Sequence, residues 1–132
     1  MSFIVDTDTC SAFIKGHPAV YSRFLQYSGR LYISVVTLGE LTIWASRARS
    51  SPKRASEVQS LLAFVTILDV TVDVGRRFGQ IQAGLLDRGR PSPPLDLLIA
   101  ATALIHGYTV VSHNTADFAN VPGLAVVDWL VP

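Results

Sequence analysis

Four carboxylates stand beside the most apolar segments of this chain, where a folded protein usually avoids charge. They are Asp6, Glu40, Asp96 and Asp117, out of ten Asp and Glu residues in all. Asp6 directly follows the apolar run 3–5, and Asp96 directly precedes the apolar run 97–101. An ionised carboxylate beside a core is costly unless it is paired, hydrogen-bonded or bound to a metal. Several such groups with no Lys or Arg among them therefore predict a divalent-cation site.

Short apolar strands alternate with helices along the whole chain. Strands are predicted at 3–5, 31–36, 66–70, 108–111 and 125–127. Helices are predicted at 8–14, 17–27, 38–49, 54–64, 74–86 and 95–105, with a short helix or turn at 115–118. The alternation is typical of a three-layer α/β/α sandwich with a central, mainly parallel sheet of about five strands. The length of 132 residues suits one domain over 1–132.

In a parallel sheet of this kind, ligand sites lie at the carboxyl ends of the strands. Asp6 ends the first predicted strand, Glu40 lies in the first turn of the helix after the second, and Asp117 follows the fourth. Asp96 reaches the same edge if its helix runs antiparallel to the strand that comes next. The four acids are therefore predicted to meet at one edge of the sheet.

Each acid also has a purely structural explanation. Thr37 and Glu40 match a capping box, with Thr37 as the helix N-cap. Asp6 is a candidate cap for the helix after it, Asp96 suits a helix start, and Asp117 suits a turn. The cap and catalytic roles are compatible, because helix N-termini stabilise carboxylates.

Composition limits the class of protein. A net charge of +1 excludes a strongly basic nucleic-acid binder by total charge, and 49% hydrophobic residues leave apolar surface for a homodimer or a second protein to cover. The single cysteine, Cys10, excludes an intrachain disulfide and fits a reducing compartment. The longest apolar stretch, 97–105, is shorter than the roughly 20 residues that span a bilayer. With no secretory signal in view, we expect a cytoplasmic protein that does not enter a membrane.

Five segments, in this order and spacing, resemble those of the PIN-domain ribonucleases, and within them the VapC-type toxins of bacterial toxin–antitoxin pairs. The segments are 4–7, 34–41, 96–104, 112–118 and 127–129. The resemblance covers nearly the whole chain. It implies the PIN fold and a Mg²⁺- or Mn²⁺-dependent endoribonuclease.

The resemblance also assigns residues to the site. Asp6, Glu40 and Asp96 match the three firm acids of the family. We favour Asp117 for the fourth position, with Asn114 as the alternative and otherwise as a neutral ligand or water-holder. Asp6 and Asp96 are then direct metal ligands, Glu40 is a ligand or a base that positions water, and Asp117 completes a second metal site or acts through water.

Supporting residues and partners follow from the same resemblance. Thr7 and Ser112 match hydroxyl positions that line the family's site, whereas Asp8 replaces the commoner Asn and adds negative charge. The implied partners are an RNA substrate and a cognate antitoxin, whose extended tail is expected to offer an Arg to the acids. Arginines that are candidates for holding the RNA are Arg47, Arg49, Arg54, Arg88 and Arg90.

Two alternatives come from other classes of protein. The segment Asp6-Thr7-Asp8 also resembles the first motif of haloacid-dehalogenase-like phosphatases, although neither Lys15 nor Lys53 is well placed for the Lys those enzymes need. The other alternative is a catalytically silent PIN-fold binding module. Oxygen ligands without a Cys/His set favour Mg²⁺ or Mn²⁺ over zinc in the nuclease interpretation.

Overall fold

Five parallel strands form the central sheet, in the order β3-β2-β1-β4-β5. The computed structural model describes residues 1–131, and Pro132, the last residue of the predicted domain, lies outside the described part. Ile4 in the central strand pairs with Tyr32 of β2 on one side and with Val110 of β4 on the other. The strands are β1 (Phe3–Val5), β2 (Leu31–Ser34), β3 (Thr66–Leu68), β4 (Thr109–Val111) and β5 (Val126–Val127). The predicted parallel sheet is confirmed.

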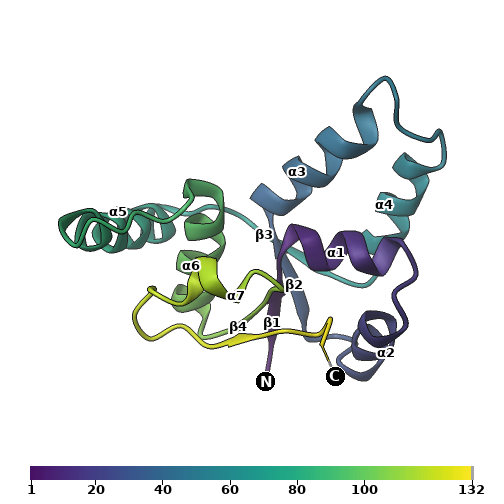
Figure 1. The fold of residues 1–132 in the computed structure, drawn as a ribbon. Coiled ribbons are helices and arrows are strands. Elements are labelled where there is room, and N and C mark those ends of the chain that lie inside the picture. The colour runs from purple at the N-terminus through teal and green to yellow at the C-terminus, as the bar shows by residue number, and fades with distance from the viewer. Residues whose placement is uncertain (132) are drawn as a thin grey trace.

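Helices cover both faces of this sheet and complete the three predicted layers (Figure 1). One face carries α1 (Thr7–Ile14), α2 (Pro18–Gln26), α3 (Val35–Ser46) and α4 (Arg54–Leu62). The other carries α5 (Val72–Asp87), α6 (Pro94–His106) and α7 (Thr115–Phe118). In Figure 1, α3 and α4 form one arm of the molecule, and α5 forms a second arm on the other side. Both arms extend away from the edge of the sheet at which β1 begins.

The alternation of side chains along β1 explains why the core has two halves. Phe3 and Val5 point into the cluster under α1 to α4, whereas Ile4 points into the cluster under α5 and α6. All three side chains are almost completely buried. Each contributes roughly 1.5–3 kcal/mol through removal of apolar surface from water.

The boundary between β2 and α3 differs from the prediction. The strand ends at Ser34, whose Oγ accepts a hydrogen bond from the Val36 amide at 3.0 Å and caps a helix that begins at Val35. Thr37 is therefore inside the helix, Glu40 lies in its second turn, and the predicted capping box is wrong. The β-branched pair Val35 and Val36 favours a strand locally, but the Ser34 cap and packing of the helix override that preference.

The other boundaries that matter for the site agree closely with the prediction. The helix α6 begins at Pro94 and ends at His106, and Gly107 caps it in the left-handed conformation at φ 73°. Its N-terminus therefore lies at the carboxyl edge of the sheet, with Asp96 in the first turn. The helix α5 begins at Val72, two residues earlier than predicted, because Thr71 caps it. Within residues 1–131 no helix is long and apolar enough to cross a membrane.

Candidate active site

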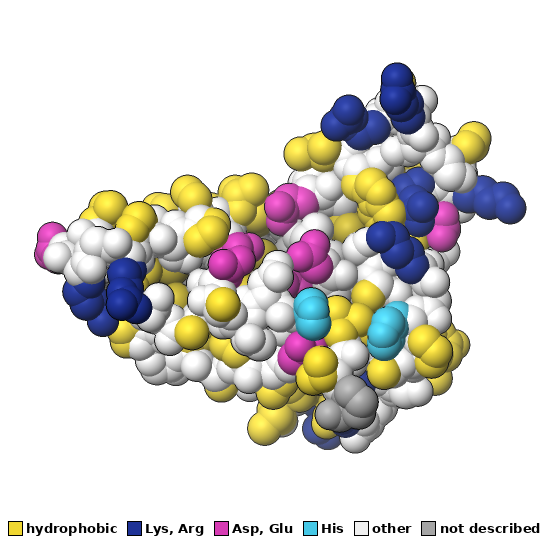
Figure 2. All heavy atoms as spheres, in the orientation of Figure 1, with side chains coloured by type: hydrophobic (Ala, Val, Ile, Leu, Met, Phe, Trp, Pro, Cys, Tyr) yellow, Lys and Arg dark blue, Asp and Glu magenta, His cyan; other side chains and the backbone are white. Residues whose placement is uncertain are grey.

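Acidic side chains gather in a cleft at the carboxyl edge of the sheet. Figure 2 shows them near the centre of one face, between α3 and the pair α6 and α7. The cleft has a volume of about 210 Å³. It is lined by Asp6, Thr7, Asp8, Glu40, Asp96 and Asn114. The structure thus brings together three of the four predicted acids, from three different elements.

Asp6 is held by the helix that it starts. Its side chain is only 5% exposed, and Oδ1 accepts a hydrogen bond from the Thr9 amide at 2.9 Å, which confirms the predicted cap. Burial raises the pKa of Asp6, and hydrogen bonds from Ser112 and Thr9 oppose that rise. The carboxylate is therefore partly desolvated and fixed in orientation, and fixed orientation suits a metal ligand.

Glu40 reaches the cleft from the second turn of α3. Its Oε1 accepts a hydrogen bond from the Thr7 hydroxyl at 2.5 Å, and Thr7 Oγ1 also lies 3.3 Å from Oγ1 of Thr37. Thr7 is thus the hydroxyl that joins α1 to α3 across the cleft. The structure places Thr7 beside the acids, as the sequence predicted.

The side chain of Asp96 shows the effect of the cleft's negative charge most clearly. Its pKa is raised to about 6, first by burial and then by the charges of Asp117, Asp6, Glu40 and Asp8. Within the described residues the ion pairs are Arg54–Glu57 and His113–Asp128, and neither includes one of these five carboxylates. The cleft therefore holds repelling charges that no basic side chain of residues 1–131 pairs with.

Asn114 and Asp8 line the cleft together. Asn114 donates from Nδ2 to Oδ2 of Asp8 at 3.0 Å, and its backbone amide donates to the Ser112 hydroxyl at 3.0 Å. Ser112 itself is fully buried beneath the cleft. Asp8 was not among the predicted site residues. The available signal was its position two residues after Asp6, in the first turn of α1.

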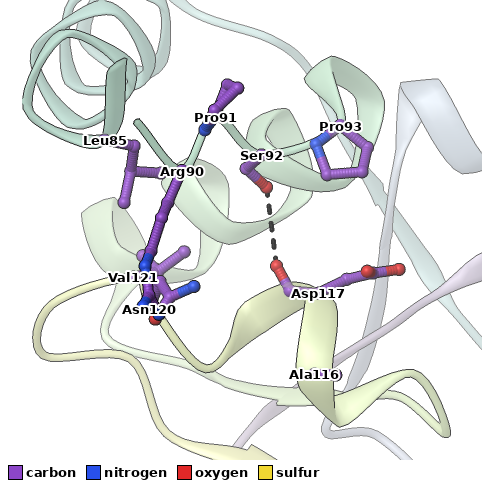
Figure 3. A pocket seen from close by; sticks show the side chains of 9 residues that line it. All are labelled: Leu85, Arg90, Pro91, Ser92, Pro93, Ala116, Asp117, Asn120 and Val121. Atoms are coloured by element: carbon purple, nitrogen blue, oxygen red, sulfur yellow. Dashed lines mark hydrogen bonds between the residues drawn. The ribbon is translucent and has the colours of Figure 1, made fainter. Parts of the chain in front are cut away.

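Asp117 lies beside the cleft instead of lining it. Asp117 lines a neighbouring pocket of about 200 Å³, together with Arg90, Ser92 and Asn120 (Figure 3). Figure 3 shows its carboxylate extending away from Arg90 and Asn120, while its backbone carbonyl accepts a hydrogen bond of 3.5 Å from the Ser92 hydroxyl. Among the charges that raise the pKa of Asp96, the charge of Asp117 has the largest effect. The choice between Asp117 and Asn114 as the fourth site position stays a prediction.

The chemistry of these groups fits a hard divalent cation. Carboxylates, an amide and hydroxyls supply oxygen donors, which Mg²⁺ and Mn²⁺ prefer and which suit zinc less well. As the side chains stand, no three His, Cys, Asp or Glu residues among 1–131 are grouped closely enough to hold one ion. Mg²⁺ usually keeps several waters and takes only one or two protein carboxylates, so an open cleft of this kind suits it.

Comparison with known proteins agrees with the fold. The model of the PIN domain matches residues 3–124. The chain is 35% identical to the tRNA(fMet)-specific endonuclease VapC of Shigella flexneri, over 98% of each chain. It is 30% identical to Ribonuclease VapC2 of Haemophilus influenzae, over 98% of this chain and 99% of the relative.

Two crystal structures superpose closely on the whole fold. DNA-bound VapBC from Salmonella typhimurium matches with a TM-score of 0.91 at 32% identity, covering 98% of each chain. VapBC2 from Rickettsia felis, bound to a DNA fragment from the promoter, matches with a TM-score of 0.90 at 25% identity, covering 98% of this chain and 99% of that one.

These matches show the family to which the chain belongs and a narrower group within that family. The chain belongs to the PIN domain family, and within that family to the VapC group, whose relatives above are named as endonucleases or ribonucleases. The family assignment rules out the phosphatase alternative that was drawn from Asp6 and Asp8.

Proposed function

We propose that this protein is a divalent-metal-dependent endoribonuclease and the toxin of a toxin–antitoxin pair. The observation that carries the proposal is the cleft itself, where carboxylates from α1, α3 and α6 face one another and the pKa of Asp96 is raised to about 6. The names of the VapC relatives support the same activity. Mutual repulsion of this kind stabilises nothing by itself and is relieved when a cation binds.

The side chains have distinct roles in the proposed reaction. Asp6 and Asp96 hold the ion, with Asp6 fixed by its cap and Asp96 presented by the first turn of α6. Glu40, oriented by the Thr7 hydroxyl, positions the attacking water or acts as a further ligand. When bound, Mg²⁺ or Mn²⁺ supplies the charge neutralisation at the scissile phosphate and the lowered pKa of the water. Asp117 acts beside Asp96, at a second ion or through water.

The proposed substrate is RNA, and transfer RNA is the first substrate to test. The Shigella flexneri relative, at 35% identity, is named for specificity toward tRNA(fMet). The two arms on either side of the cleft leave it open on the face seen in Figure 2, where a strand of RNA can reach the acids. Incubation of purified protein with total transfer RNA, followed by sequencing of the fragment ends, identifies the target.

The proposed partner is an antitoxin that silences this cleft. The related crystal structures from Salmonella typhimurium and Rickettsia felis are of VapBC complexes. An Arg from such a partner is the expected counter-charge for Asp96 and its neighbours, since a guanidinium pairs with carboxylates in a bidentate manner. A homodimer and a cytoplasmic location stay predictions from the sequence.

The test of the function uses substitutions that keep the fold. Asp96→Asn removes a charge without changing shape, and Asp6→Asn keeps an oxygen to cap Thr9. We expect both variants to lose metal-dependent cleavage by at least about a hundredfold. Binding of RNA without cleavage by the wild-type protein in Mn²⁺ favours the silent binding module instead. Full activity in the presence of saturating antitoxin contradicts the silencing.

A further inference from the structure

A groove between α1 and α3 continues from the acidic cleft. It encloses about 220 Å³ and is lined by Thr7, Asp8, Ser11, Lys15, Leu41 and Trp44. Thr7 and Asp8 line both the groove and the cleft, so the two spaces adjoin. Nothing in the proposed cleavage chemistry uses the far end of the groove, where Lys15 and Trp44 lie.

The spacing of residues along both helices gives the groove its direction. Thr7, Ser11 and Lys15 follow one another at intervals of four, so they share one face of α1 and its C-cap. Glu40 and Trp44 have the same interval on α3. The hydrogen bond between Thr7 and Glu40 marks the cleft end. Lys15 lies about 12 Å further along the helix axis, at a rise of about 1.5 Å per residue.

The far end combines an aromatic face with positive charge. The Arg54 guanidinium carbon lies 4.0 Å from the Trp44 ring centroid, and the Lys15 ammonium lies 5.6 Å from it. Trp44 is only half-buried, which leaves part of the indole free to contact a ligand. Arg54 has one carboxylate nearby, that of Glu57 at 3.6 Å. Cations held against an indole in this way are already ordered and desolvated on one side.

The positive charge extends beyond the groove. Segment 47–54, which runs from the end of α3 to the first residue of α4, contains four Lys and Arg residues and no Asp or Glu. Figure 2 shows Lys and Arg side chains gathered over this arm, at a distance from the acidic centre of the same face. A polyanion whose reacting phosphate lies in the cleft therefore meets favourable potential as it leaves along this groove.

We propose that the α1–α3 groove is a nucleotide-binding subsite, in which an RNA base contacts Trp44 and a flanking phosphate pairs with Lys15. This inference rests on the proposed function, because it assigns a path to the strand that the cleft cuts. An aromatic ring flanked by cations is how proteins hold single-stranded nucleic acid without reading its sequence. The acidic end of the groove, where Asp8 lies, does not hold the base in this proposal and belongs to the cation site of the cleft.

The test measures RNA binding separately from cleavage. The chain contains two tryptophans, so Trp129→Phe leaves Trp44 as the sole source of indole fluorescence. In that protein, with Asp96→Asn added to prevent cleavage, an RNA octanucleotide is titrated in Mg²⁺. We expect quenching of Trp44 fluorescence on binding, as stacking against a base produces.

Substitutions at the groove then show which side chains bind the RNA. Trp44→Leu is expected to weaken binding about tenfold, whereas Trp44→Phe keeps most of the affinity because it keeps a π-face. Lys15→Gln is compared with Arg30→Gln, since Arg30 is an exposed cation at the amino end of β2, on the opposite edge of the sheet. Only Lys15→Gln is expected to weaken binding and to reduce its salt dependence.

The outcomes separate this inference from the proposed function. In protein that retains Asp96, Trp44→Leu is expected to raise KM with little change in kcat. If the wild-type protein cleaves RNA, and Trp44→Leu and Trp44→Phe both bind RNA with unchanged affinity, the subsite is overturned and the nuclease proposal stands. Loss of antitoxin binding in Trp44→Leu with unchanged RNA affinity also overturns it. RNA binding that depends on Trp44 in a protein that never cleaves supports the subsite and contradicts the nuclease.

Discussion

Thr7 donates its hydroxyl hydrogen to Oε1 of Glu40 at 2.5 Å, across 33 positions of sequence. The two residues belong to helices that follow adjacent strands, because β1 pairs with β2 in parallel and each strand leads into a helix at the same edge. The bond therefore fixes the position of the one cleft acid that comes from α3.

Replacement of Thr7 tests whether this bond orients Glu40 for the reaction. Thr7→Val keeps the shape but removes the donor, so Glu40 loses its partner and samples other rotamers. We expect kcat on RNA to fall about tenfold and the free energy of unfolding to change by about 1 kcal/mol or less. Thr7→Ser restores the donor and most of the rate. A Thr7→Val enzyme with the wild-type kcat contradicts the assigned role.

Repulsion within the cleft predicts that one acid destabilises the metal-free protein. The pKa of Asp96 is raised from 3.8 to about 6, so the folded state holds this proton more tightly than the unfolded state does. The free energy of unfolding therefore falls as pH rises through that window, and the full penalty persists above it. Solvent screening at this half-buried position leaves a penalty of about 1–2 kcal/mol.

Urea denaturation in chelator measures this penalty. Asp96→Asn is expected to be more stable than the wild type by about 1–2 kcal/mol near pH 7.5, and to lose that advantage near pH 4. An advantage that is the same at both pH values means that the proton on Asp96 is not its source.

Without metal, ionised Asp96 destabilises the folded protein; with metal bound, it is expected to stabilise it. A cation replaces the proton on Asp96, so Mg²⁺ stabilises the folded protein more strongly above about pH 6 than below it. Thermal melts with and without Mg²⁺, at about pH 5 and about pH 7.5, are expected to show a larger rise in Tm at the higher pH. Equal rises at both values indicate a cation site elsewhere.

Asp8 adds a further negative charge to the cleft that it lines. Asp8→Asn is expected to weaken Mg²⁺ affinity a few-fold, because the cleft loses one of the carboxylates that act on Asp96. The hydrogen bond with Asn114 survives, since the new side chain keeps an oxygen acceptor. Isothermal titration measures the affinity. Asp87→Asn, an exposed charge at the end of α5, is the control and is expected to have no effect.

Gln82 holds the segment that leads into α6. Its Nε2 donates to the Ser92 carbonyl at 2.8 Å, and its Oε1 accepts from the Ser92 amide at 3.0 Å. Gln82→Leu removes both bonds and leaves two half-buried backbone groups without partners. We expect a loss of about 1–3 kcal/mol in the free energy of unfolding. Gln80→Leu, at an exposed position on the same helix, is expected to stay within about 0.5 kcal/mol of wild type.

The strand-end acids were predictable because topology alone places them. Asp6 follows β1 directly. Asp96 opens a helix that must begin at the edge where β1 ends and run back to the edge where β4 begins, since β4 is parallel to β1. Glu40 reaches the same cleft although the start of its helix was misplaced by three residues, because one further turn of α3 still faces the strand edge. Periodicity and the rule for parallel sheets were sufficient for these three.

Other features depend on how helices pack, which periodicity does not show. Asp117 lies on a helix of four residues, too short for a pattern to orient it. The surroundings of Trp44 are visible only in the structure, where α1 lies beside α3 and brings Lys15 toward its ring. The start of α3 was missed because Val35 and Val36 are strand formers by propensity, whereas the Ser34 cap and tertiary packing decide the structure.

The most direct test of the nuclease is cleavage of total cellular RNA by the purified protein, in Mg²⁺ or Mn²⁺ and in chelator, beside Asp96→Asn. The variant's stability in chelator is measured first, so that loss of activity is not loss of fold. We predict discrete fragments from the wild type that disappear both on chelation and in the variant. Intact RNA in the presence of the metal, or fragments that Asp96→Asn still produces at the wild-type rate, contradicts a metal-dependent nuclease centred on this cleft.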